Sequence, residues 1–340
     1  MKFDFVIGNP PYQDENVGEN NQAKPVYNLF MDSAYSIGEI VELITPARFL
    51  NQAGATPKDW NKKMLNSNKL KVLFYSEDSS EIFNGVDIKG GVVVTYFDNK
   101  ANYEPIGVFI KNEDLRRIFS KIKKYLDKNI GDLVHSPDAY RFTDEMFSEN
   151  PQLIDRTDKA HAKAVASSVF ERYPEIFTED KGEGYVKVVG RKSGERKALY
   201  VKENYLNDPG NLHTWKVLVA GAIGTGTFGE VLSDFIVMEP KSAHTQTFVS
   251  MGEFETQYEA SALCKYLKTK FARALLGIMK TTQNNQSKMV WSKIPIQDFS
   301  NASDIDWSAS IADIDKQLYK KYNLSNEEIN FIETKVKEME

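Results

Sequence analysis

The chain opens with a short apolar run that a rigid turn ends at once. Residues 3–7 are apolar apart from Asp4, a composition typical of a buried strand in an α/β sheet. Gly8 follows, and the two prolines at 10–11 can neither donate to a sheet ladder nor continue a helix. We therefore expect Asn9 in a turn at the carboxyl end of a strand, the edge at which open α/β sheets bind ligands.

The pattern up to residue 97 then alternates between helix and strand. Residues 13–24 are polar and predict a loop that could close over a substrate. Pro25 fits the first turn of a helix. We expect helices from Pro25 to about 35 and over 58–66, and strands over 40–46, 70–75 and 90–97. This order predicts the second half of a doubly wound sheet with an antiparallel final pair of strands.

The rest of the chain predicts a mixed α+β region with helices at its end. The expected elements are a basic helix over 113–130, a hairpin of strands 184–190 and 197–201, β-like runs at 217–220 and 230–240, and a long helix over 255–276. Two helices should follow residue 305. Ser308 could cap the first, and Ser325 with Glu328 forms a capping box for the second.

Composition limits the classes of protein that this chain could be. A chain of 340 residues suggests two domains. No window approaches the roughly 18 apolar residues of a membrane span, and the first apolar run is too short for a signal peptide, so we expect a cytoplasmic location. Cys264 is the one cysteine, which excludes disulfides and cysteine metal sites; its apolar neighbours predict a buried thiol. The net charge of −5 leaves room only for a local basic face.

The turn at Asn9 has a specific chemical capacity. The Asn9 side-chain oxygen and the Pro10 carbonyl are two acceptors in fixed geometry, which could bind both hydrogens of one amino group and leave its nitrogen free to attack an electrophile. Tyr12 offers a ring on which an unstacked base could lie. The structural alternative is a strand-capping turn in which Asn9 only satisfies the turn.

Residues 2–12 resemble the Asn-Pro-Pro-Tyr motif of DNA methyltransferases that act on adenine N6, with Asn9, Pro10, Pro11 and Tyr12 as the motif. The resemblance extends over 25–97. It implies S-adenosyl-L-methionine as donor, beside Asn9 and Phe30, and no metal. It also implies that Phe83 contacts the flipped base opposite Tyr12. For both Phe30 and Phe83 the alternative is packing in the core.

The same resemblance implies a donor-binding half that we do not find in this sequence. The family binds its donor on the first half of the sheet, at a Gly-rich turn, and no such half lies ahead of Asn9. The sequence G-T-G-T-F-G at 224–229 matches G-x-G-x-x-G, yet a β-like run follows it where a helix is required, so a Gly-rich turn is the better interpretation. We expect this chain alone to bind the donor weakly and not to turn over. A separate chain could supply the missing half, and a nuclease could accompany it.

Several basic and amide-rich segments could contact double-stranded DNA. The helix at 255–276, the polar loop after it, Trp291 and Ile294-Pro295 resemble the target-recognition region of TaqI-like and type IIG restriction–modification methyltransferases. The alternatives are solvent-facing turns, a solvated helix face over 113–130 and a flexible polar loop. The expected DNA-contacting residues are Lys24, Arg191, Lys192, Lys280, Thr281, Gln283, Asn284 and Lys288.

Taken together, the sequence predicts an adenine-N6 DNA methyltransferase of a restriction–modification system. Its fold class is α/β: a partial Rossmann-like sheet over 1–105, an α+β target-recognition domain over 106–300 and a helical appendage over 301–340. Two alternatives remain: a catalytically silent DNA-binding specificity module, and methylation of a protein glutamine, whose amide the same motif could grip. Cytosine N4 is a closer competitor on chemical grounds.

Overall fold

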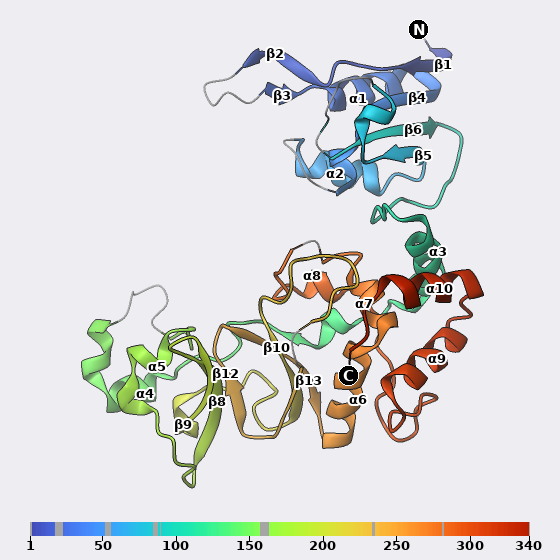
Figure 1. The fold of residues 1–340 in the computed structure, drawn as a ribbon. Helices are drawn as coiled ribbons and strands as arrows, with labels where there is room; N and C mark the ends of the chain where they lie inside the picture. The colour runs from blue at the N-terminus through green and yellow to red at the C-terminus, as the bar shows by residue number, and fades with distance from the viewer. Residues whose placement is uncertain are drawn as a thin grey trace. The chain divides into compact units, whose positions relative to one another are not determined.

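In the computed structural model, the described residues are 2–17, 23–51, 56–83, 88, 90–156, 163–232, 235–280 and 282–339. The chain forms two compact units, Met1–Lys111 and Asn112–Glu340 (Figure 1). No helix among these residues is long and apolar enough to cross a membrane.

The first unit is built on a four-stranded sheet in the order β1-β4-β6-β5 (Figure 1). Strand β1 is parallel to β4, and β6 is antiparallel to both β4 and β5. β1, β4 and β5 therefore point the same way, and their carboxyl ends meet at one edge of the sheet. The predicted antiparallel pair of final strands is present, with β6 inside the sheet. The strands are β1 (Phe3–Gly8), β4 (Gly38–Pro46), β5 (Leu70–Ser76) and β6 (Val92–Asp98).

Two helices close one core against this sheet. They are α1 (Tyr27–Ile37) and α2 (Lys58–Leu65), both close to the predicted ranges. The apolar positions of α1 recur at spacings of three and four residues, which places them on one face. The buried cluster includes Tyr27, Met31, Ala34, Val41, Phe49, Trp60, Met64, Val93 and Phe97.

The segment predicted as a loop over 13–24 contains a short ribbon instead. β2 (Gln13–Val17) pairs antiparallel with β3 (Ala23–Pro25), and residues 18–22 lie outside the described residues. Backbone pairing needs no apolar alternation, so the polar pattern did not reveal it. Pro25 is the last residue of β3, and α1 begins at Tyr27, so the prediction of Pro25 in the first helical turn is wrong.

The expectation that residues 3–7 form a buried strand is half wrong: the strand is present but it is not buried. β1 is the edge strand, and Phe5 and Ile7 are 66% and 79% exposed. An apolar composition reports what a strand can bury, whereas burial itself requires a covering partner. Among the described residues β1 pairs with β4 only.

The second unit contains two small sheets with helices around them (Figure 1). Their orders are β11-β10-β13-β7 and β12-β8-β9. The strands are β7 (Val134–His135), β8 (Tyr185–Lys192), β9 (Glu195–Lys202), β10 (Trp215–Ala220), β11 (Ile236–Met238), β12 (Ser242–His244) and β13 (Phe248–Phe254). The helices are α3 (Glu113–Ile122), α4 (Asp144–Glu149), α5 (Val169–Arg172), α6 (Gln257–Lys268), α7 (Lys270–Leu276), α8 (Lys288–Trp291), α9 (Ile311–Lys321) and α10 (Asn326–Lys335).

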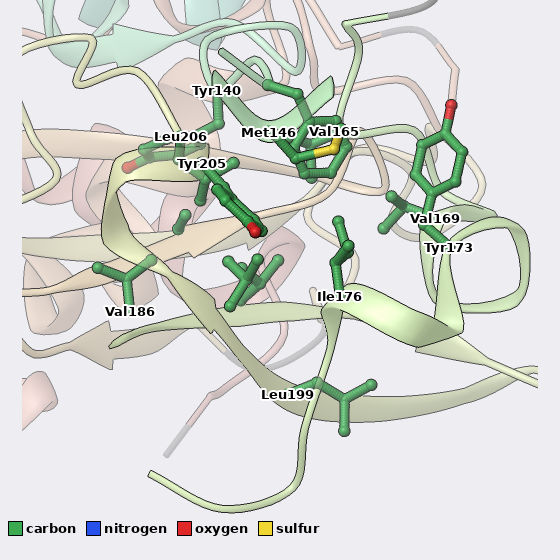
Figure 2. Packing of buried hydrophobic residues seen from close by; sticks show 14 of the residues in the cluster. Tyr140, Met146, Val165, Val169, Tyr173, Ile176, Val186, Leu199, Tyr205 and Leu206 are labelled. Atoms are coloured by element: carbon green, nitrogen blue, oxygen red, sulfur yellow. The ribbon is translucent and has the colours of Figure 1, made fainter. Parts of the chain in front are cut away.

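One hydrophobic core of this unit lies against the hairpin of β8 and β9. Figure 2 shows Tyr173, Ile176 and Leu199 among its buried side chains, with the sulfur of Met146 nearby. The hairpin was predicted at nearly these residues. The C-terminal helices α9 and α10 belong to this unit, where α10 packs on α3 and α7.

Four local expectations in the second unit need correction. The helix predicted over 255–276 breaks at Thr269, whose Oγ1 accepts the N–H of Ala272 and caps α7. Ser310, not Ser308, caps α9. The basic helix ends at Ile122. The thiol of Cys264 is only half-buried. The capping box of Ser325 and Glu328 on α10 is confirmed.

Candidate functional site

The strand register gathers three segments at one edge of the first sheet. Gly8 lies opposite Leu43, so the residues after β1 lie beside the last residues of β4. β5 ends at Ser76, opposite Val92, where β6 begins. The segment 9–12, the end of β4 and the segment after β5 therefore meet at the edge where open α/β sheets hold ligands.

Asn9 is exposed at this edge, and no hydrogen bond to another described residue engages its carboxamide. The alternative in which Asn9 satisfies its own turn finds no support in these contacts. Pro10 is half-buried and Pro11 is exposed. The acceptors of Asn9 and Pro10 thus sit at the rim of the sheet, where a polar ligand group could reach them.

Tyr12 is held in place at both its backbone and its ring. Its carbonyl accepts the N–H of Val26 at 3.2 Å, just ahead of α1. Its ring packs against the core of the first unit while remaining partly accessible. The hydroxyl is buried without a partner among the described residues, and this burial raises the pKa of Tyr12. A fixed ring of this kind could serve as a stacking surface.

Phe83 follows β5 at the same edge. It closes a short turn in which its N–H donates to the carbonyl of Ser79 at 2.9 Å, and its side chain is half-buried. Residues 84–87, which come next, lie outside the described part of the chain. The topology thus brings the segments of Tyr12 and Phe83 to one edge, although 71 positions separate them in the numbering.

Phe30 does not belong to the core. It is 46% exposed on α1, next to the exposed Leu29, so the alternative of ordinary core packing fails for this residue. Ile37, at the end of α1, is exposed as well. Together with the exposed side chains of β1, these residues leave apolar surface open on this unit.

The Gly-rich segment 224–229 is closed by an acid from its own chain. The carboxylate of Glu230 accepts the backbone N–H groups of Thr225 at 2.7 Å and Gly226 at 2.9 Å. These are the amides that a phosphate-binding loop would offer to a ligand. The interpretation as a Gly-rich turn fits this geometry, and a cofactor does not.

Lys280 is the partner of that acid, which corrects its assignment to DNA contact. Lys280 is only 5% exposed, and its Nζ lies 2.8 Å from Oε1 of Glu230. The ammonium also donates to the carbonyls of Ile223 and Thr282. Burial alone would raise the pKa of Glu230, but the hydrogen bonds from Lys280 and the loop amides hold it at about 2.

Three of the predicted DNA-contacting residues of the polar loop are exposed. Gln283, Asn284 and Lys288 face solvent, while Thr281 lies outside the described residues. The N–H of Ile223 donates to the carbonyl of Gln283 at 2.8 Å, and the buried Trp291 donates from Nε1 to the carbonyl of Asn285 at 2.8 Å. These bonds tie the loop backbone to Ile223 and Trp291.

The basic hairpin is less available than its sequence indicated. Arg191 donates to the carbonyl of Gly194 at 2.8 Å, across the turn. Glu171 accepts the N–H of Ser193 at 3.1 Å, so an acid lies at the tip. Lys192 is half-buried. In the first unit, Lys24 is exposed on β3.

Sequence reasoning missed a buried polar cluster in the second unit. Nε2 of His244 lies 3.1 Å from Oγ of Ser250, and the same hydroxyl accepts Nδ2 of Asn211 at 3.0 Å. Burial lowers the pKa of His244 to about 4. Lys216 lies nearby with its pKa lowered by burial to about 8. No pattern along the chain relates these residues, because two distant stretches, 211–216 and 244–250, contribute them.

Part of the first unit is similar to a known protein family. Residues 1–83 match the family model described as Eco57I restriction-modification methylase. A stretch of 107 residues is 32% identical to an uncharacterized adenine-specific methylase of Mycoplasma pneumoniae, covering 31% of this chain and 25% of that protein. The chain thus spans about a quarter of the length of this curated relative.

Two solved structures overlap most of the chain. One is the type IIG restriction endonuclease BpuSI, which is 11% identical in sequence. The alignment covers 97% of this chain and 52% of that chain, with a TM-score of 0.33. The other is the type IIL restriction–modification enzyme MmeI in complex with DNA, which is 9% identical in sequence. The alignment covers 97% of this chain and 56% of that chain, with a TM-score of 0.34. The family match over residues 1–83 includes Asn9 to Tyr12, and with the adenine-specific methylase relative it confirms the predicted relationship to restriction–modification adenine methyltransferases.

Proposed function

We propose that this chain supplies the base-binding edge and DNA-contacting surfaces of a site-specific adenine-N6 DNA methyltransferase of a restriction–modification system. The observation that carries the proposal is Asn9, whose exposed carboxamide has no partner among the described residues at the carboxyl edge of the sheet. The methylase match over residues 1–83 supports the class of reaction.

The chemistry follows from two acceptors and two rings. Oδ1 of Asn9 and the carbonyl of Pro10 would each accept one hydrogen of the adenine amino group. This pairing aims the nitrogen lone pair at an electrophile and stabilises positive charge as it develops on the nitrogen. The base would be extruded from the duplex and held between Tyr12 and Phe83. S-adenosylmethionine, when bound, supplies the electrophilic methyl group.

In this proposal the donor-binding half lies outside the described residues. The amides of the Gly-rich loop are occupied by Glu230, which leaves that loop unfit for the donor. β1 ends the sheet with Phe5 and Ile7 exposed, so the donor-binding half would pair with this edge and pack on these side chains. Phe30 would then border the donor site from α1.

DNA contact is assigned to the second unit, with Lys24 of β3 as an additional contact from the first. Gln283 and Asn284 present amide groups that can read base edges, and Lys288 presents an ammonium for phosphate. Arg191 and Lys192 of the hairpin are weaker candidates, because an acid lies at its tip. We propose residues 106–300 as the target-recognition domain.

A methyl-transfer assay tests the function. The chain is incubated with labelled S-adenosylmethionine and mixed genomic DNA, with and without the polypeptide that holds the donor-binding half. We expect N6-methyladenine only in the complete mixture, and its loss in Asn9→Ala. The matched control is Asn301→Ala, an exposed asparagine of the second unit. Transfer that survives Asn9→Ala would refute the assigned role.

The same assay separates the alternatives. Label in protein glutamine rather than DNA would favour the amide-methylating alternative. Sequence-specific DNA binding in the complete mixture without any transfer would identify a silent specificity module. Nucleoside analysis of labelled DNA distinguishes adenine N6 from cytosine N4.

A further inference from the structure

One exposed apolar side chain stands among the polar groups of the loop after α7. Met289 is 62% exposed at the start of α8, directly after Lys288. Gln283 and Asn284 are exposed on the same loop. With most of its surface exposed, the unbranched thioether packs little in this unit, and its flexibility suits an irregular apolar contact.

The backbone beneath Met289 is rigid. Oγ of Ser287 accepts its N–H at 3.2 Å, and its carbonyl accepts Oγ of Ser292 at 2.8 Å. The helix ends at Trp291, which is buried. On the other side Gly131 approaches so closely that a Cβ there would lie 2.4 Å from the carbonyl oxygen of Lys288. The Met289 side chain therefore projects from a backbone that is held in place.

Positively charged side chains lie on the segments next to α8. Lys128 is exposed, and its carbonyl accepts the N–H of Ile296, so it lies in the chain segment that runs beside the one after α8. Lys293 lies over the ring of Phe119 at 6.0 Å. Lys288 adds a third positive charge. The exposed Lys128 and Lys288 could meet phosphates on either side of an opened base step.

We infer that Met289 is a wedge that enters the base stack of bound DNA and fills the space that an extruded base leaves. Proteins that open a stack insert single apolar side chains, methionine among them, between base steps. The neighbouring donors would hold the flanking phosphates and base edges while the thioether contacts base faces. This role rests on the proposed DNA-binding function and adds a residue to it.

Binding to opened and intact duplexes tests the wedge. Fluorescence anisotropy compares a mixed-sequence duplex with the same duplex carrying a central abasic site. We expect the full chain to prefer the abasic duplex by at least about fivefold, because the stack there is already open. Met289→Ala should abolish this preference and leave affinity for the intact duplex within about twofold.

Two further variants separate the possible failures. Ile154→Ala removes another exposed apolar side chain of the second unit, one outside the polar loop, and should retain the preference. Lys288→Ala should weaken both duplexes alike and reduce the salt dependence. If the wild type binds neither duplex, the proposed DNA-binding function fails. If it binds and Met289→Ala keeps the abasic preference, the wedge alone is refuted.

Discussion

The carboxylate of Glu230 and the ammonium of Lys280 form a buried ion pair, with Oε1 and Nζ 2.8 Å apart. The acid also holds the amides of Thr225 and Gly226, and the lysine holds the carbonyls of Ile223 and Thr282. Both charges are therefore fully bonded within the chain. The pair ties the Gly-rich turn to the segment after α7, and it explains why neither the loop amides nor the Lys280 ammonium is free to bind a ligand.

Removing the lysine should destabilise the second unit. Lys280→Met leaves the Glu230 carboxylate buried without its countercharge, a change that costs about 3–5 kcal/mol. Urea unfolding followed by tryptophan fluorescence measures the loss. Lys288→Met, an exposed lysine of the same loop, should stay within about 0.5 kcal/mol of wild type. Equal effects of the two substitutions would contradict the buried pair.

Stability should depend on pH through His244. Its ordinary pKa of 6.5 falls to about 4 in the folded state because burial disfavours the charged ring. Between these values the unfolded chain binds more protons than the folded chain. The contribution of His244 to the free energy of unfolding is therefore fully present above pH 6.5 and is lost as the pH falls to about 4. The contribution is up to about 3 kcal/mol.

The pH dependence is checked by urea unfolding at a series of pH values. His244→Gln should flatten the slope between pH 6.5 and 4. His135, whose pKa burial also lowers, contributes in the same direction, so some slope should remain. A variant with the full wild-type slope would show that another group controls the dependence.

The hydroxyl of Tyr12 should be dispensable for folding. It is buried without a partner among the described residues, so Tyr12→Phe removes an unsatisfied polar group and should change the unfolding free energy by no more than about 0.5 kcal/mol. Tyr12→Ala removes the packed ring and should cost about 3 kcal/mol. Thermal and urea unfolding of the two variants provide the comparison, and a large loss in Tyr12→Phe would reveal a hidden hydrogen bond.

The open edge of the first sheet should make the isolated chain self-associate. Phe5 is 66% exposed on β1, and apolar edge strands pair with other copies. Phe5→Lys should reduce self-association in light scattering and leave stability within about 0.5 kcal/mol. Tyr258→Lys, on the exposed face of α6, should leave association unchanged. The Phe5 variant should also lose methyl transfer in the complete mixture, because it disturbs the edge that the donor-binding half would cover.

Local patterns predicted the elements well where the signal lies within a few residues. The capping box of Ser325 and Glu328 and the hairpin of β8 and β9 were found because short-range chemistry defines them. The break at Thr269 was missed: the apolar periodicity of α6 continues into α7, and only the backbone conformation interrupts it. The ribbon of β2 and β3 was missed because polar strands carry no alternation.

The sequence by itself located the end of the first strand at Gly8, because the glycine and the two prolines after it restrict the backbone locally, and the chemistry of Asn9 stays a prediction. The tertiary structure decided which side chains are free. It buried Lys280 against Glu230, left Phe30 and Ile7 exposed, and brought the segments of Phe83 and Tyr12 to one sheet edge. Burial and pairing depend on which distant segments meet, and neighbours along the chain do not encode that information.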